Sequence, residues 1–350
     1  MNTFEKHLIK EDIQITVALE KLNALSGEGI LMLFVLNDQQ IVKGVLTDGD
    51  VRRGFLKGLS LEDDTSKFMN QDFIYLKRNR YSVADLDELR KRSVKLLPVV
   101  DDDFKLIRIA DFVQKRSVLP IDAVMMAGGK GERLKPLTDT IPKPMLMVGN
   151  KPIIEHNVDR FIDYGIDHIH ISVKYLAEHI KNHLEDGSNK NIHISYVHED
   201  EPLGTIGSLS LIKQFHHDTI MVMNSDLLTN IDLEEFYREF ENNNAEMSVA
   251  TIPYTVSIPY AVLETDHEKV ISLKEKPNYT YYSNAGIYLI KRDVINLIPE
   301  NSFFNATDLI ELLIKMNKKV SSFPLLGYWL DIGKPEDFKK AQEDFEHIKF

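Results

Sequence analysis

The feature that most constrains the fold is a regular alternation of short apolar runs and amphipathic stretches that begins at Ile121. Short apolar runs are typical of buried strands, and a 3.6-residue period is typical of helices. The pattern predicts strands at 121–127, 167–173, 191–197, 219–226 and 245–253, and helices at 151–165, 177–186, 205–215 and 232–243. This order predicts an α/β fold with a mostly parallel sheet, whose ligands bind beyond the carboxyl ends of the strands.

A glycine-rich loop with several cations follows the first predicted strand, with the sequence MAGGKGERLKPLTDTIPKP at 126–144. Three glycines of the loop can present backbone N–H groups to phosphate oxygens, namely Gly128, Gly129 and Gly131. Arg133 adds a planar, permanently charged group, and Lys143 stands between two prolines that stiffen its backbone. A turn with solvated charges is the simpler interpretation of the glycines alone, but the complete pattern predicts a phosphate site. It is not a P-loop, because no G-x-x-x-x-G-K-[ST] occurs here. It is not a dinucleotide fingerprint either, because GKGERL lacks the last glycine of G-x-G-x-x-G.

Charge and cysteine content exclude several classes of function. The 350 residues carry a formal net charge of -12, which argues against wrapping around nucleic acid or binding an anionic membrane. There is no cysteine, so disulfides, thiol catalysis and cysteine-type zinc sites are excluded. The charged N-terminal stretch lacks the apolar segment of a secretory signal, and the apolar run at 30–36 is too short to span a bilayer. We therefore expect a cytoplasmic protein with no nucleic-acid or membrane partner.

The loop and five later motifs resemble the signature of sugar-1-phosphate nucleotidyltransferases, which include glucose-1-phosphate thymidylyltransferases and mannose-1-phosphate guanylyltransferases. The later motifs occur in the order of that family: EPLGTIGSL (201–209), NSD (224–226), EKP (275–277), NAGIYLI (284–290) and GYWLDIGKPEDF (327–338). The resemblance implies a Rossmann-like nucleotidyltransferase domain at 119–350. It also implies an enzyme that joins a sugar 1-phosphate to a nucleoside triphosphate and releases pyrophosphate.

The implied reaction needs charge neutralisation more than proton transfer. The second pKa of a phosphate monoester is about 6, so the attacking oxygen is already anionic at neutral pH. The site must then align two polyanions and neutralise their charge. By resemblance, Arg133 holds the leaving pyrophosphate, Lys143 contacts the reacting phosphate, and the Mg²⁺ ligands are Asp226 and Asp331. Two carboxylates suit Mg²⁺, which keeps waters and phosphate oxygens as its other ligands, although an isolated aspartate is more often a helix cap or turn residue.

The resemblance also implies the residues that bind the two substrates. The nucleotide-binding set is Ala127, Gly128, Gly129, Gly131, Glu201 and Gly204. The set that binds the sugar phosphate is Glu275, Lys276, Asn284 and Gly286. Lys276 would contact the phosphate, and Glu275 would accept hydrogen bonds from sugar hydroxyls or an amino group, whereas a solvated surface pair is the simpler alternative.

The segment PLGT at 202–205 is more similar to the guanylyl than to the thymidylyl members of the family. Guanine carries donors at N1 and N2, so either Glu199 or Glu201 is a candidate acceptor, and we expect Thr205 to cap the following helix. Many relatives have Pro-Tyr-Gly where this chain has Ala261 after Pro-Tyr, which weakens any transfer of glucose or mannose specificity.

Three other side chains receive structural interpretations. His168 and His170 alternate on one predicted strand with no third ligand at metal-binding spacing, so we interpret them as core-edge or surface residues. Trp329 lies two residues from Asp331, and we expect it to orient that aspartate by packing.

The first third of the chain contains an internal repeat. FVLND at 34–38 matches PVVDD at 98–102, and each copy predicts a helix, a hairpin and a closing helix, with Thr16 and Ser82 as the N-caps. The repeat resembles a tandem pair of cystathionine-β-synthase (CBS) domains at 1–118, with a linker at 112–121. This smaller domain either senses a nucleotide or only dimerises.

The CBS resemblance is strongest in GVLTDGDVRRG at 44–54. It implies that Thr47 and Asp50 contact the ribose of an adenine nucleotide and that Arg52 or Arg53 meets its phosphates. The second copy has no Thr-x-x-Asp, so one adenosine site is implied at most.

The combination of a CBS pair and a transferase resembles a narrower group, the guanylyltransferases that make GDP-linked glucosamine for bacterial legionaminic acid synthesis. It implies GTP and glucosamine 1-phosphate as substrates and a homo-oligomer. The alternatives are a mannose-1-phosphate guanylyltransferase, a glucose-1-phosphate thymidylyltransferase and an inactive nucleotide-sensing protein. A Rossmann dehydrogenase would need the missing glycine.

Overall fold

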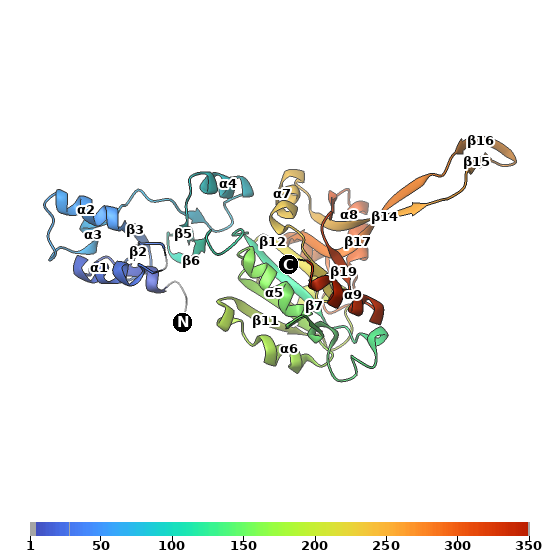
Figure 1. Cartoon of the computed structure of the whole chain (residues 1–350), viewed down its shortest axis with the longest axis horizontal. Coiled ribbons are helices and arrows are strands. Elements are labelled where there is room, and N and C mark those ends of the chain that lie inside the picture. Colours follow the sequence, from blue (N-terminus) through green and yellow to red (C-terminus); the bar gives the residue numbers. More distant parts are fainter. Residues whose placement is uncertain (1–4, 28, 349–350) are drawn as a thin grey trace.

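The computed structural model describes residues 5–27 and 29–348. Figure 1 shows three parts along the longest axis: a smaller N-terminal part, a central domain built on one large sheet, and a long two-stranded arm. The arm lies at the opposite end of the molecule from the N-terminal part.

The internal repeat folds into two matching three-stranded sheets. Their elements are β1 (Leu8–Lys10), α1 (Ile15–Ala24), β2 (Met32–Leu36), β3 (Val42–Thr47), α2 (Asp48–Leu56), α3 (Thr65–Phe68), β4 (Leu76–Lys77), α4 (Val83–Lys91), β5 (Leu96–Val100) and β6 (Leu106–Asp111). In each sheet the first pair of strands is parallel and the second antiparallel. The register shifts between Val35 and Leu36 in one copy and between Val99 and Val100 in the other, which are equivalent positions of the repeat.

Two details of the predicted repeat are wrong. Helix α1 begins at Ile15 with Gln14 as its N-cap, so Thr16 lies inside the helix, because Gln14 already has an extended backbone and Ile15 is fully buried. The second copy has no closing helix, because the carboxylate of Asp111 accepts the N–H groups of Val113 and Gln114 and forms a turn. Ser82 is confirmed as the cap of α4.

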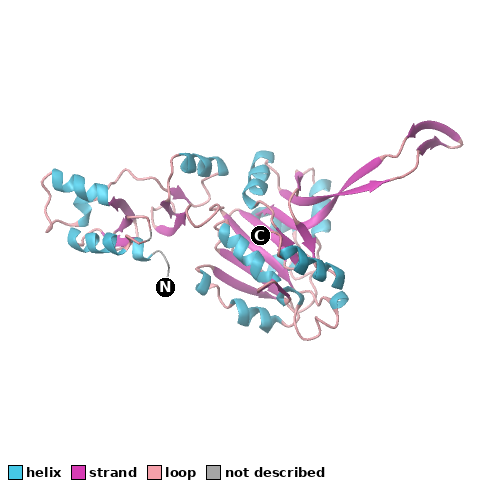
Figure 2. Ribbon diagram, viewed as in Figure 1, coloured by secondary structure: helices cyan, strands magenta, loops and turns pink. Residues whose placement is uncertain are grey.

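The central domain is an α/β fold with a seven-stranded sheet (Figure 2). The strand order is β11 (His193–His198), β10 (His168–Val173), β7 (Ile121–Ala127), β12 (Thr219–Asn224), β17 (Asn278–Lys291), β14 (Met247–Ser257) and β18 (Val320–Pro324). Only β17 is antiparallel to its neighbours, so the predicted mostly parallel sheet is confirmed. The helices are α5 (Ile153–Asp163), α6 (Ala177–Leu184), α7 (Leu233–Asn243), α8 (Ala306–Lys315) and α9 (Pro335–Phe345).

The remaining strands form two-stranded ladders. They are β8 (Met147–Val148) with β9 (Lys151–Pro152), β13 (Leu227–Thr229) with β19 (Trp329–Asp331), and β15 (Val262–Asp266) with β16 (Lys269–Lys274). The 3-10 helices are η1 (Glu5–His7), η2 (Glu132–Leu134), η3 (Lys143–Met145), η4 (Ser188–Lys190), η5 (Gly207–Leu211) and η6 (Arg292–Leu297). The helix predicted at 205–215 is therefore wrong. Gly207 has a low helix propensity. The hydroxyl of Ser210 donates to the carbonyl of Gly207, and this bond competes with the backbone hydrogen bonds of an α-helix.

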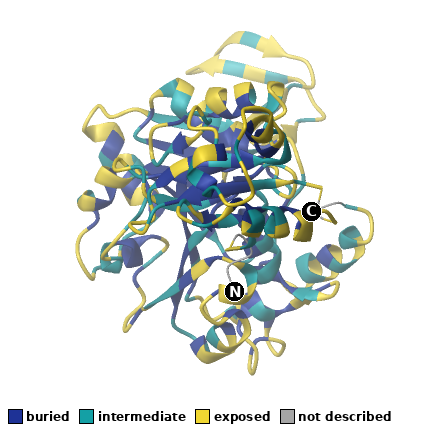
Figure 3. Cartoon of the chain, turned by 90° about the vertical axis from the view of Figure 1, so that its left-hand side faces the viewer, coloured by how far each residue is buried: buried dark blue, intermediate teal, exposed yellow. Residues whose placement is uncertain are grey.

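The sheet is buried on both faces, and Figure 3 shows its strands as the dark-blue centre of the molecule. The second repeat shares this core. Leu86 of α4 and Leu97 of β5 belong to the same hydrophobic cluster as Ile121 of β7 and Phe161 of α5. The first repeat has a separate core that includes Ile15 and Leu33. The boundary placed at 118 from the sequence stays a prediction, and it lies within the shared core.

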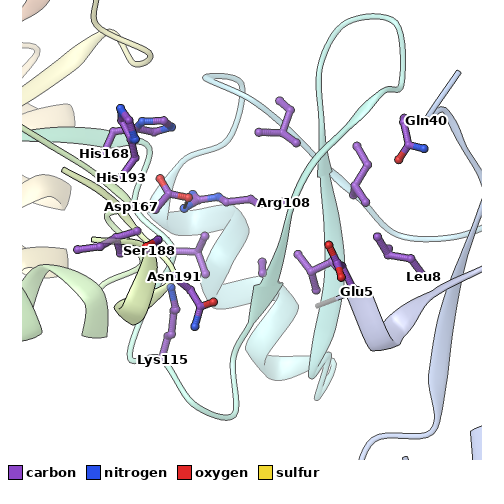
Figure 4. A pocket seen from close by; sticks show the side chains of 16 residues that line it. Glu5, Leu8, Gln40, Arg108, Lys115, Asp167, His168, Ser188, Asn191 and His193 are labelled. Atoms are coloured by element: carbon purple, nitrogen blue, oxygen red, sulfur yellow. Dashed lines mark hydrogen bonds and ion pairs between the residues drawn. The ribbon is translucent and has the colours of Figure 1, made fainter. Parts of the chain in front are cut away.

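Arg108 of β6 joins the second repeat to the central domain. Its guanidinium donates to the carbonyl of Gly165 at 2.5 Å and to the carboxylate of Asp167 at 2.9 Å. The pair borders a cavity of about 570 Å³ between the two parts, shown in Figure 4 with Lys115 and His193 on its walls. The orientation of the N-terminal part is thus fixed through a largely buried ion pair.

Within 5–27 and 29–348, we find no helix that is both long and apolar enough to cross a membrane.

Candidate active site

The β13–β19 ladder brings the two predicted metal ligands together. Leu227 pairs with Asp331, and the N–H of Ile332 donates to the carbonyl of Asp226 at 3.2 Å. Asp226 and Asp331 therefore lie side by side although 104 residues separate them in the chain. This ladder stands beyond the carboxyl end of β12, where the α/β pattern predicts a ligand site.

Lys143 lies between the two carboxylates. Its ammonium group forms an ion pair with Asp226 and stands 3.6 Å from Asp331. The lysine is in η3, where Pro142 and Pro144 flank it, and its side chain is mostly buried. The predicted rigid placement of this cation is therefore found in the structure.

The two aspartates have unused acceptors. One buried carboxylate oxygen of Asp226 and one of Asp331 have no hydrogen-bond partner. Burial, with the charge of Asp226 nearby, raises the pKa of Asp331. Buried carboxylate oxygens without a hydrogen-bond partner are stabilised by a cation, so the pair fits a divalent metal ion. Groups of three or more acidic or histidine side chains that could hold a metal ion are absent from the described residues.

Arg133 lies beside this cluster. A Cβ atom added at Gly333 would stand 3.2 Å from the guanidinium of Arg133. The charge of Arg133 also acts to lower the pKa of Asp331. The side chain is exposed, so it is accessible to an anionic ligand at the edge of the site.

The glycine loop forms one wall of a cavity of about 400 Å³ next to the cluster. Gly131 has a left-handed backbone with φ of 64°, and a Cβ there would lie 3.0 Å from Lys143. At Gly128 a Cβ would approach the carboxylate of Glu199 at 3.0 Å, whereas Gly129 has open space around it. Side chains at two of the three positions would therefore press on residues that face the cavity.

Only some of the predicted nucleotide-binding residues line the cavity. The cavity is lined by Gly128, Gly129 and Gly204, and Ala127 ends the strand that leads into it. Glu201 is exposed and outside the lining, whereas the buried Glu199 lies in the wall, where it accepts the hydroxyl of Ser172 and the N–H of Leu203.

The segment around Gly204 packs against the start of α8. A Cβ at Gly204 would stand 2.7 Å from the carbonyl of Phe304, and Thr205 accepts the N–H of Ala306. Thr205 thus supports the start of α8, whose N-cap is Asn305, and does not cap a helix that follows it, so that prediction is wrong. This contact holds the wall of the cavity that contains Leu203.

The predicted sugar-binding residues separate into two groups. Gly286 lies at the cavity, because a Cβ there would stand 2.6 Å from the side chain of Asn224, which lines it. Asn284 accepts the N–H of Gly286 at 2.9 Å. Glu275 and Lys276 instead follow β16 in the arm, which extends beyond the sheet (Figure 1), and neither residue lines the cavity.

Some cavity residues have no counterpart in the sequence prediction. Lys130 and Lys174 line the cavity, together with Asn224 and Phe303. Lys130 stands within the glycine loop and could have been included with its neighbours. Lys174 follows the buried strand β10, so its position after a parallel strand was the available signal.

His168 and His170 of β10 are packed into the edge of the core, in agreement with their structural interpretation. His168 stacks on His216 with ring centres 3.8 Å apart, and burial lowers its pKa to about 4. His170 is buried. Trp329 donates from its indole N–H to the carbonyl of Ala285 at 2.9 Å, and its effect on the orientation of Asp331 stays a prediction.

A model of the nucleotidyl transferase family matches residues 122–347. The chain belongs to the nucleotidyl transferase family. The matched range contains the glycine loop, Lys143 and both aspartates, so the predicted nucleotidyltransferase is confirmed at the level of the family.

Curated nucleotidyl transferases are similar over the central domain. The mannose-1-phosphate guanylyltransferase of Mycobacterium tuberculosis is 33% identical over 230 residues, which are 64% of this chain and 64% of that protein. The bifunctional protein GlmU of Methanocaldococcus jannaschii is 32% identical over 230 residues, 64% of this chain and 54% of that protein. The chain thus spans less than two thirds of the length of these relatives.

Solved structures of nucleotidyl transferase type share the fold. A putative glucose-1-phosphate thymidylyltransferase from Bacillus anthracis is 25% identical, with a TM-score of 0.54 over 66% of this chain and 97% of that one. HddC from Yersinia pseudotuberculosis is 29% identical, with a TM-score of 0.51 over 64% of this chain and 99% of that one.

Asp331→Asn tests the electrostatics of the site. The pKa of Asp331 is raised, so its ionised form destabilises the fold at any pH above its ordinary pKa. The substitution should therefore keep or raise the melting temperature at pH 7, and the difference from wild type should shrink as the pH falls and the carboxyl group protonates. Thermal unfolding from pH 4 to 8 measures this. A lower melting temperature of the variant at pH 7 would contradict the assignment.

Proposed function

We propose that this nucleotidyl transferase moves a nucleotidyl group from a nucleoside triphosphate to a sugar 1-phosphate and releases pyrophosphate. The observation that carries the proposal is the convergence of Lys143, Asp226 and Asp331 beside a cavity lined by the glycine loop. Our preferred substrates are GTP and glucosamine 1-phosphate. A cytoplasmic enzyme fits this choice of substrates.

The protein's contribution to this reaction is alignment and charge neutralisation. An anionic sugar phosphate attacks the α-phosphorus of the triphosphate, and no base is needed. Gly128 and Gly129 line the cavity, so their N–H groups can bind phosphate oxygens. Lys143 is held at the same cavity and neutralises charge at the reacting phosphate, while Arg133 is exposed at the edge and binds the departing pyrophosphate.

Asp226 and Asp331 would hold Mg²⁺. The fit rests on their two buried oxygens that have no hydrogen-bond partner. When bound, the ion supplies positive charge to the phosphate oxygens. In the structure Lys143 partly offsets the two carboxylates.

A guanine base is favoured by one side chain of the cavity. The buried Glu199 places a carboxylate in the wall that also contains Leu203 and Gly204. A carboxylate accepts from the N1 and N2 donors of guanine, whereas uracil and thymine offer one ring donor. The similarity to a mannose-1-phosphate guanylyltransferase supports this choice. Uridylyl and thymidylyl transfer remain the alternatives, because relatives and solved structures with those names are also similar.

A substrate screen tests the function. Each of the four nucleoside triphosphates is combined with glucosamine 1-phosphate, mannose 1-phosphate or glucose 1-phosphate, with Mg²⁺, and released pyrophosphate is measured. We expect the highest rate with GTP and glucosamine 1-phosphate. A higher rate with another pair would replace the substrates, and no pyrophosphate from any pair would support an inactive sensing protein.

We propose that the N-terminal repeat is a CBS pair that binds an adenine nucleotide near Thr47 and Asp50. In the structure these two residues form a capping box at the start of α2, and Asp50 also bonds Arg53 at 2.5 Å. Asp50 is buried, so a ligand must either use the same oxygens or displace these bonds. Dimerisation without a ligand is the alternative role.

Asp50→Ala separates these roles. AMP or ADP at millimolar concentration should raise the melting temperature of the wild type, and the variant should lose that shift. Because the carboxylate of Asp50 accepts the backbone N–H of the N-cap Thr47 and so completes the capping box of α2, the variant alone should be destabilised by about 1 kcal/mol. Asp85→Ala removes the equivalent carboxylate from the capping box of α4 and is the matched control, which should keep the nucleotide shift. No shift in the wild type would leave dimerisation as the role.

A further inference from the structure

The arm, residues 253–282, is a two-stranded ribbon without support from the rest of its chain. It continues β14 and β17 beyond the sheet and carries β15 and β16 towards its tip (Figure 1). Beyond Thr251, β14 pairs with β17 alone, because its pairing with β18 ends there. Every hydrogen bond and ion pair given for residues 254–282 joins two residues of the arm.

The arm exposes many large apolar side chains. Nine of them are Tyr254, Val256, Tyr260, Leu263, Val270, Ile271, Leu273, Tyr281 and Tyr282. Tyr260 is 75% exposed, and both faces of the ribbon contribute. An isolated two-stranded ribbon is marginally stable in water, and contiguous exposed apolar surface marks an interaction site. The arm therefore needs a protein surface to pack against.

The size of the arm matches one side of a stable interface. Such an interface buries roughly 800 Å² on each partner and uses about 20–30 residues a side. A buried aromatic side chain contributes roughly 150–250 Å², so the four exposed tyrosines supply a large share of that area. The unpaired edges of both strands add backbone donors and acceptors.

Lys276 is presented by a strained backbone in the middle of the arm. It has a left-handed φ of 43° although it is not glycine, and it precedes Pro277, which disfavours that conformation further. The N–H of Ile258 bonds the carbonyl of Pro277 at 3.0 Å and fixes this turn. Lys274 is paired with Glu264 at 2.5 Å, whereas Lys276 is exposed and has no ion pair within the described ranges. Strain of this kind is found mainly at functional positions.

The positive charge of the lysines that line the cavity of the same chain is partly offset. Its three lysines, Lys130, Lys143 and Lys174, are offset by the carboxylates of Glu199 and Asp226. Both proposed substrates are polyanions. An exposed cation at a fixed position on the arm would add to the positive charge that such substrates require.

We propose that the arm packs on a second copy of this chain and places Lys276 at the cavity of that copy, where it binds the sugar phosphate. The inference rests on the proposed function. The arm begins at the rim of its own cavity, because Gly286 of β17 faces Asn224, and then runs away from it. A two-fold axis near the rim lets each arm cross the cavity of the other copy, and two-fold dimers are the commonest oligomers. Each active site is then completed by the partner subunit.

Complementation between two inactive variants tests this arrangement. Asp226→Asn and Lys276→Ala are co-expressed with different affinity tags, and the heterodimer is isolated by two purification steps. Each variant alone should have less than about a tenth of wild-type pyrophosphate release, and the heterodimer should recover about half, because one of its two sites then has both residues. Lys269→Ala is the control. Lys269 is another lysine of the arm that forms no ion pair among the described residues, so this variant should keep wild-type activity.

The outcomes separate the inference from the function on which it rests. An inactive heterodimer beside an active wild type, or full activity of Lys276→Ala alone, would overturn the placement of Lys276 in the partner's site. Sedimentation provides a readout independent of activity: the wild type should be a dimer at micromolar concentration, and Tyr281→Ser with Tyr282→Ser should be a folded monomer. A monomeric wild type would overturn the docking of the arm. The wild type could be inactive with every substrate pair and still form a dimer that depends on the arm. This result would reject the proposed function and the role of Lys276 but keep the docking of the arm.

Discussion

Asp226→Asn should lower kcat by about 10³-fold or more, which is a loss of about 4 kcal/mol of transition-state stabilisation. The substitution removes the charge of one proposed metal ligand while keeping an oxygen that can accept from Lys143. The fold should survive, because Asp226 is linked to β19 through its backbone carbonyl. Pyrophosphate release at saturating GTP, sugar phosphate and Mg²⁺ measures the loss.

Two comparisons make that result specific. Asp200→Asn alters an exposed aspartate close to the cavity residue Glu199 and should keep wild-type turnover. Binding of Mn²⁺ to the wild type and to Asp226→Asn, followed by electron paramagnetic resonance, reports on the metal site without turnover. Near-wild-type kcat for Asp226→Asn would remove this residue from the metal site.

The sequence predicts the architecture of the central domain well, because each buried strand is a continuous apolar run. The run at Ile121 and the periodicity at 153–163 suffice to predict a strand, a helix and a mostly parallel sheet. The 3-10 helix η5 shows the limit, since Gly207 and Ser210 lower the stability of a helix whose apolar spacing is otherwise correct.

The candidate site is harder to predict than the fold from local sequence patterns. Asp226 and Asp331 meet only because β13 pairs with β19, and no periodicity predicts a pairing between segments so far apart. Here the family resemblance supplied what local pattern lacks. The resemblance also grouped Lys276 with the cavity residues, whereas the path of β14 and β17 past the edge of the sheet takes it into the arm. Neither the motifs nor the composition predicts that these two strands extend beyond the sheet as an arm.

Arg108→Met should destabilise the protein by about 3–5 kcal/mol, because it leaves the charge of Asp167 largely buried and without its partner. Burial by itself raises the pKa of Asp167, but Arg108 outweighs it and lowers that pKa from 3.8 to about 2. The stability that this carboxylate contributes is therefore complete above about pH 4 and is lost as the pH falls towards 2. Urea unfolding at pH 7 measures the cost, and acid unfolding should lose its Asp167 component in the variant.

The comparison with a surface pair shows why this junction has a large effect. Arg80 and Asp102 also form an ion pair, at 2.8 Å, but both side chains are more than half exposed, so Arg80→Ala should cost less than about 1 kcal/mol. Arg108→Met combined with Asp167→Leu should recover part of the lost stability, because no charge is then left unpaired in the buried junction. Recovery in the double variant identifies the ion pair as the source of the cost. Equal losses for Arg108→Met and Arg80→Ala would instead mean that water reaches the junction and that the N-terminal part is held by its apolar core and by other ion pairs, such as Arg90 with Glu234.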